Sequence, residues 1–175
     1  MSTCSYLSAV NQKLLFAKKL IKLLQANTAA SQDRHMQVAI AQSVTLQLGQ
    51  AWSWHLQDVA TNYKVKDPSL VNSVDELEQS LLDEGKQPAE STELKQLFYT
   101  TDSWANNMLF AFSQLSSLPA VRKAEMDSDR LPMLSLDDAT DSQRKAVDWD
   151  LAEAISWSKQ MNELVERHRD MMIEF

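Results

Sequence analysis

The chain has 175 residues, a net charge of −7 and a single cysteine. It contains only 2 Gly and 4 Pro, whereas average usage over this length gives about twelve Gly and nine Pro. Because hairpins and β-bulges rely on such residues, this composition excludes a sheet-rich fold and indicates an all-α one. A hydrophobic content of 44% and a charged content of 23% exclude wholesale disorder.

The first predicted helix covers residues 5–27. Three of its lysines, Lys18, Lys19 and Lys22, lie roughly opposite its apolar residues, and we predict that they form part of a partner surface. The apolar residues recur three and four positions apart, as on one face of an α-helix; they are Leu7, Val10, Leu14, Ala17, Ile21 and Leu24.

The second predicted helix covers residues 33–66, with Ser31 or Asp33 as its N-cap. It ends before Pro68, since the residue before a proline is disfavoured in the helical conformation. Gly49 lies inside this helix, where it costs roughly 1 kcal/mol relative to alanine. The glycine therefore indicates a close helix crossing or a kink.

Two further helices are expected in the middle of the chain. Ser73 and Glu76 have the spacing of a capping box and open a short helix over residues 73–84. A long helix over residues 91–118 follows, because apolar residues continue along one face until Pro119 stops it.

Residues 119–139 are predicted to form a connection, and a last helix covers residues 140–171. Thr140 and Gln143 give this helix a second capping-box pattern. Four long helices and one short one, each with an apolar face, predict a single domain over residues 1–175 that folds as a mostly antiparallel helical bundle.

Charge is unevenly distributed along the chain. Residues 1–27 hold four lysines and no acidic residue, whereas residues 67–102 hold nine acidic residues and two lysines. Net acidity argues against nucleic-acid binding, which needs clustered cations. The polarity predicts that the basic first helix lies beside the acidic middle of the chain or beside another molecule; solvated faces without a specific partner are the other interpretation.

The sequence also bears on location. No apolar run approaches the ~18 residues that a membrane-spanning helix needs, so no integral membrane segment is expected. Lysines interrupt the apolar residues near the N-terminus, which argues against a signal peptide. The lone Cys4 cannot form an intrachain disulfide. We therefore expect a cytoplasmic protein.

Catalytic motifs are missing from the sequence. There is no Glu-x-x-His pair, no glycine-rich phosphate loop and no Gly-x-Ser-x-Gly. We therefore predict no enzymatic activity, no metal and no cofactor. The alternative is a small-ligand or metal site between the second and last predicted helices, with His55, Asp58, Trp52 and His168 as its candidate residues; a buried, hydrogen-bonded histidine is the structural interpretation of His55.

Two of the five tryptophans, Trp54 and Trp149, fall off the apolar faces and are predicted to join the lysines of the partner surface. The leading hypothesis is a non-enzymatic bundle that acts through protein–protein contact, with another protein or as a homodimer. A further alternative is binding to a membrane surface or an acidic partner through the basic first helix.

The first predicted helix contains the run Asn11-Gln12-Lys13-Leu14-Leu15-Phe16-Ala17, and the second carries Tyr63 before the turn at Pro68. In both features the chain resembles an uncharacterised family of small all-helical γ-proteobacterial proteins. The resemblance implies a bacterial cytosolic protein of unknown function and supplies no catalytic residues.

Overall fold

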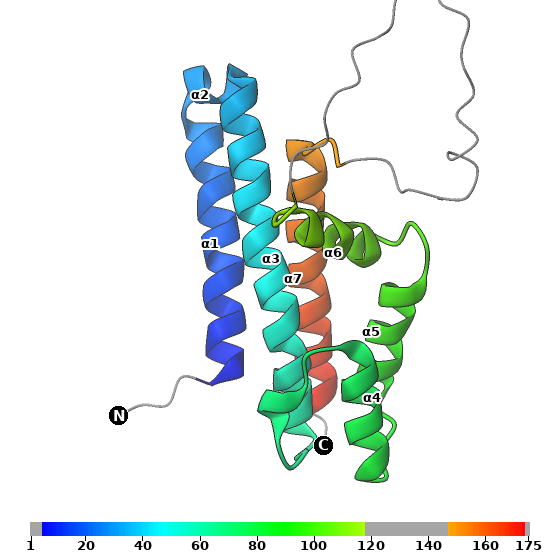
Figure 1. Cartoon of the computed structure of the whole chain (residues 1–175). Coiled ribbons are helices and arrows are strands. Elements are labelled where there is room, and N and C mark those ends of the chain that lie inside the picture. The colour runs from blue at the N-terminus through cyan, green and yellow to red at the C-terminus, as the bar shows by residue number, and fades with distance from the viewer. Residues whose placement is uncertain (1–4, 118–146, 174–175) are drawn as a thin grey trace, which may run out of the picture.

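The computed structural model describes residues 5–117 and 147–173, and these are helical without any strand, as the composition predicts (Figure 1). Three long helices form the body of the molecule: α1 (Tyr6–Ala26), α3 (Arg34–Asn62) and α7 (Leu151–Ile173). The shorter elements are α2 (Thr28–Gln32), the 3-10 helix η1 (Pro68–Leu70), α4 (Val74–Asp83), α5 (Ala89–Tyr99) and α6 (Trp104–Gln114).

Helix α3 is the centre of the fold, because α1, α4, α6 and α7 all pack against it. Its buried residues include Val44, Leu48, Leu56 and Val59, which belong to one continuous apolar core. The helix begins where the side chain of Asp33 accepts hydrogen bonds from two backbone N–H groups, so Asp33 is the N-cap and Ser31 lies in α2.

The long helices are not all antiparallel. Helix α1 runs against α3, but α7 runs in the same direction as α3 (Figure 1). Arg34 at the start of α3 meets Asp148 just before α7 at 3.3 Å, and His55 meets His168 near the other ends. The all-α prediction is confirmed for the described residues, whereas the predicted mostly antiparallel bundle of four long helices is not confirmed, because the described residues contain three long helices of which two run in parallel.

The single helix predicted over residues 91–118 is wrong: the segment forms α5 and α6, with a break between them. Asp102 adopts a left-handed conformation with φ of 63°, and the side chain of Ser103 accepts a hydrogen bond from the backbone N–H of Asn106. A turn residue followed by an N-cap ends one helix and starts the next, although the apolar spacing continues through it.

Some of the other predicted helix boundaries agree with the structure and others do not. The helices predicted over 5–27 and 73–84 are confirmed to within one residue at each end as α1 and α4, and α4 has the predicted capping box. The second predicted helix ends four residues earlier than expected, at Asn62. Helix α7 begins at Leu151, and residues 119–139 and the predicted cap at Thr140 lie outside the described residues.

Gly49 marks a helix crossing, one of the two predicted possibilities. Helix α6 packs across α3 there, and a Cβ atom added to Gly49 would lie 2.3 Å from Cδ2 of Phe112. Any other residue would therefore displace this ring. The crossing positions α6 and, through the turn at Asp102, the helix α5 that completes the polar cluster described next.

Candidate functional site

The histidines that the sequence proposed as site residues meet in the core. His55 of α3 and His168 of α7 lie with Nε2 of the first 2.9 Å from Nδ1 of the second, and both side chains are 0% exposed. Their rings stack with centroids 5.1 Å apart and planes inclined by 27°. The structure thus brings together two of the four predicted site residues, from the two helices that the prediction named.

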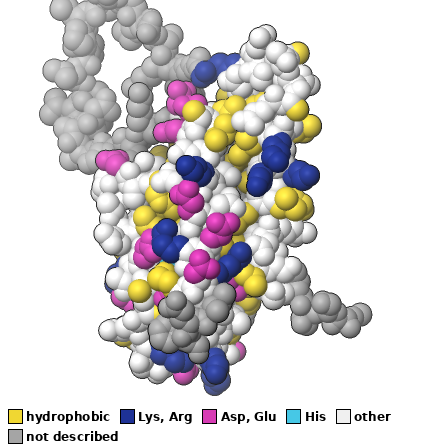
Figure 2. Space-filling view, turned by 180° about the vertical axis from the view of Figure 1, so that it is seen from behind, with side chains coloured by type: hydrophobic (Ala, Val, Ile, Leu, Met, Phe, Trp, Pro, Cys, Tyr) yellow, Lys and Arg dark blue, Asp and Glu magenta, His cyan; other side chains and the backbone are white. Residues whose placement is uncertain are grey.

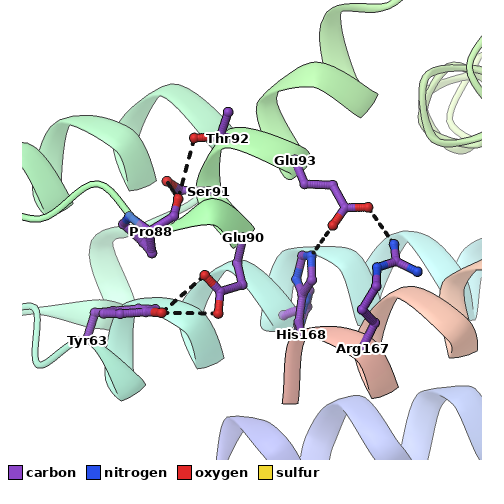
Figure 3. Close-up of polar contacts among 9 residues, drawn as sticks. Tyr63, Pro88, Glu90, Ser91, Thr92, Glu93, Arg167 and His168 are labelled. Carbon is purple, nitrogen blue, oxygen red and sulfur yellow. Dashed lines mark hydrogen bonds and ion pairs between the residues drawn. The ribbon is translucent and has the colours of Figure 1, made fainter. Parts of the chain in front are cut away.

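Glu93 of α5 extends this pair into a chain of three residues. Its Oε2 lies 3.0 Å from Nε2 of His168, and its Oε1 lies 2.5 Å from Nη2 of Arg167 (Figure 3). We call His55, His168 and Glu93 the relay; the two histidines are buried and the side chain of Glu93 is 31% exposed. Sequence reasoning missed Glu93, because a single glutamate on a predicted helix gives no signal of a partner 75 residues away.

The charge of Glu93 fixes the hydrogens of the relay. Burial alone raises the pKa of the Glu93 carboxyl, but hydrogen bonds from Arg167 and His168 outweigh it and lower that pKa. A carboxylate only accepts, so Nε2–H of His168 donates to it and Nδ1 of His168 holds a lone pair. His55 therefore donates its Nε2–H to His168, and Nδ1 of His55 is left as an acceptor.

Both histidines of the relay are neutral near neutral pH. Burial, followed by repulsion from His168 when it is protonated and from Arg169, lowers the pKa of His55 from 6.5 to about 3. Burial also lowers the pKa of His168, against the opposing effect of Glu93. The relay is therefore a pair of neutral imidazoles hydrogen-bonded to one carboxylate. Burial disfavours the charged form of histidine, so the neutral state is the stable one here.

Asp58 and Arg169 adjoin the relay at His55. Atom Nδ1 of His55, Oδ2 of Asp58 and Nε and Nη2 of Arg169 are buried without a hydrogen-bond partner. Burial raises the pKa of Asp58, while Arg169 and the backbone N–H of Leu7 oppose the rise. The cluster thus contains two unpaired acceptors, on His55 and Asp58, and the unpaired donors of the Arg169 guanidinium. The positive charge of Arg169 offsets the negative charge of Asp58 within the protein.

The cluster is a poor metal site. In the parts of the chain that the structure describes, no group of three or more His, Cys, Asp or Glu side chains is placed to hold a metal ion. His55 and Asp58 offer two lone pairs, but the positive charge of Arg169 acts on both residues. A site with two ligands beside a guanidinium lacks the ligand number and the charge that bound cations require.

Trp52, the remaining predicted site residue, belongs to a different contact. Its ring is buried and meets the ring of Trp104 edge to face, with centroids 6.4 Å apart and planes inclined by 81°. Trp104 opens α6, so this pair holds α6 on α3 near the crossing at Gly49.

A buried carboxylate, that of Glu90, lies beside the relay. The hydroxyl of Tyr63, at the end of α3, lies 3.1 Å from both oxygens of Glu90, three residues before Glu93 on α5 (Figure 3). Burial and the neighbouring Glu90 raise the pKa of Tyr63 to about 12. Helix α5 is therefore joined to α3 through Glu90 and to α7 through Glu93.

A cleft of about 440 Å³ lies on the surface between α1 and α3. We call it the α1 surface; it consists of Phe16, Lys19, Leu20, Leu23 and Gln47. Leu23 is 66% exposed and Phe16 43%. Figure 2 shows hydrophobic and basic side chains side by side along one edge of the molecule, with acidic side chains away from that edge.

The five predicted partner residues have different surroundings. Lys19 lines the α1 surface, Lys18 lines a smaller cleft of about 190 Å³ that faces α7, and Lys22 is exposed. Trp54 is half-buried, with the ammonium of Lys13 5.3 Å from its ring centre. Trp149 is also half-buried and packs against the core.

The basic first helix does not pack on the acidic helices of its own chain. The main packing partners of α1 are α2, α3 and α7, whereas α4 and α5 lie on the opposite side of the molecule (Figure 1). The intramolecular explanation of the charge polarity is therefore wrong. Contact with another molecule stays a prediction.

No family model matches the sequence, and comparisons with curated proteins and with solved structures return no match. The resemblance of the first helix to small γ-proteobacterial proteins therefore stays a prediction, as does the cytoplasmic location. None of the helices in the described residues is long and apolar enough to span a membrane.

Proposed function

We propose that this protein is a non-enzymatic interaction module that binds a protein partner through the α1 surface. The observation that carries the proposal is the exposure of Phe16 and Leu23 in a cleft beside Lys19. Contiguous exposed apolar side chains are characteristic of sites that are covered by a partner. Between residues 5 and 57, the only acidic residue is Asp33, so the partner's own surface is expected to be apolar and acidic.

The proposed absence of catalysis is supported by the state of the histidines. His55 and His168 are fully buried, three of their four ring nitrogens are hydrogen-bonded within the relay, and the fourth, Nδ1 of His55, is itself buried. A general base must come within hydrogen-bond reach of a substrate proton, which these nitrogens do not. The same burial gives less support to a ligand pocket at His55.

The partner is proposed to contribute a helix. Four residues of α1 and Gln47 of α3 line the cleft, so its floor follows about two turns of α1. A partner helix laid in this cleft would place its apolar face on Phe16, Leu20 and Leu23.

The proposal is tested by quantitative pull-down from cells that produce the protein, comparing wild type with Leu23→Asp. The matched control is Leu70→Asp on η1, where the leucine is 68% exposed and lies outside the α1 surface. We expect a stoichiometric partner with wild type and Leu70→Asp and its loss with Leu23→Asp. Equal recovery with all three chains, or no partner with any, would contradict the proposal; binding to anionic vesicles instead would favour the membrane alternative.

A further inference from the structure

A second surface of the molecule also exposes apolar side chains, but its charged residues are acidic, whereas those of the α1 surface are basic. Helices α4 and α5 present Leu82, 41% exposed, and Tyr99, 55% exposed, among acidic side chains. The hydroxyl of Tyr99 lies 2.5 Å from Oδ2 of Asp75, and Asp75 and Leu82 are seven residues apart on one side of α4. Together with the exposed Asp83, these residues form what we call the α4–α5 surface.

The charge of this surface is acidic after its internal pairing is counted. Lys95 lies on α5 and pairs with Glu78 of α4 at 2.5 Å, which neutralises one carboxylate. Asp75 and Asp83 remain without a basic partner among the ion pairs of the described residues. Apolar side chains flanked by carboxylates are the complement of the α1 surface, where apolar side chains are flanked by lysine.

The two complementary surfaces cannot meet within one molecule, because α1 and the α4–α5 pair lie on opposite sides of α3 and α7 (Figure 1). A symmetric contact of α1 with α1 would bring two basic helices together without any acidic residue between them. The acidic counterpart that the chain itself carries is the α4–α5 surface.

We propose that the partner of the α1 surface is a second copy of this chain, which docks its α4–α5 surface there. This inference rests on the proposed function, because it names the occupant of the same surface. The contact is heterologous, because it joins two different surfaces. An open assembly of any length therefore has one free α1 surface at one end and one free α4–α5 surface at the other. Such contacts generate a closed ring or an open, head-to-tail chain of molecules.

The proposal is tested by sedimentation and light scattering of the full chain, with two surface variants. The double variant Lys19→Glu, Leu23→Asp blocks the α1 surface, and Leu82→Lys, Asp83→Lys blocks the α4–α5 surface. All four positions are exposed or line a surface cleft, so both variants are expected to keep the helical content of wild type by circular dichroism.

Head-to-tail docking predicts that wild type associates in a concentration-dependent way and that salt weakens the association. Each variant alone stays monomeric, whereas an equimolar mixture forms a dimer of twice the monomer mass and stops there, because only one productive contact remains. A monomeric wild type, or a mixture that stays monomeric, would overturn the proposal. If wild type is monomeric but Leu23→Asp loses a different protein in the pull-down, the proposed function stands and the self-docking inference falls.

Discussion

Acidification is expected to destabilise the protein through His55. Its folded-state pKa is about 3, against 6.5 for an unburied histidine. Between these values the unfolded chain binds a proton at this residue that the folded chain does not bind. The free energy of unfolding therefore falls as the pH falls below about 6.5. Each pH unit in this window corresponds to about 1.4 kcal/mol, so His55 alone removes about 2 kcal/mol by about pH 5.

Other groups contribute in both directions, so the measurement compares variants. The lowered pKa of His168 acts in the same sense as that of His55. The raised pKa of Asp58 acts in the opposite sense, because the folded state then binds its proton first. The variant His55→Gln removes the titration and can keep a donor near the position of Nε2, and His35→Gln is the control, because His35 is exposed on the first turn of the same helix.

The assay is denaturant unfolding followed by circular dichroism at neutral and mildly acidic pH. We expect wild type and His35→Gln to lose about 2 kcal/mol more than His55→Gln between about pH 7 and about pH 5. An equal loss in wild type and His55→Gln would refute the reasoning, because His55 would then titrate alike in the folded and unfolded chains.

Four further substitutions test the packing and capping of the helices. Gly49→Ala is expected to destabilise by about 1–3 kcal/mol despite the better helix propensity of alanine, because its Cβ would overlap Phe112; urea melts measure this. Ser73→Ala removes the capping box of α4 and is expected to cost about 1 kcal/mol by the same assay. Leu23→Asp is expected to change stability by less than about 0.5 kcal/mol, whereas Leu48→Ala in the core costs about 2–5 kcal/mol; similar losses for the two would mean that α1 is packed on its outer side.

Local signals predicted the parts of the fold that local chemistry determines. The capping box at Ser73 and Glu76 was recognisable because both partners lie within one helical turn. The apolar spacing of α1 was recognisable for the same reason, and four of its six predicted positions are buried in the structure. The break at Asp102 was missed because the apolar spacing continues across it, so periodicity alone gives the same pattern for one helix and for two.

The candidate site was predictable only in part. His55 and His168 each lie on the apolar side of a predicted helix, which marked them as buried. Their contact spans 113 residues of sequence and depends on the direction and axial position of α7, which no local pattern sets. Glu93 was not recognisable for the same reason. The predicted partner surface combined lysines of the first helix with Trp54 and Trp149 and did not include Phe16 or Leu23, since their exposure follows from which side of α1 the other helices leave open.

The relay offers an explanation for the parallel arrangement of α3 and α7. Sliding α7 by one helical turn, or reversing it, would separate His168 from His55 and from Glu93 while leaving all three side chains near the core. Each buried polar group that loses its partner costs about 1–3 kcal/mol. Apolar packing alone discriminates less sharply between registers, because one leucine contact replaces another. We infer that the relay selects one register of α7 and, through Glu93, the position of α5, so that it acts on the α4–α5 surface by placing the helix that carries Tyr99.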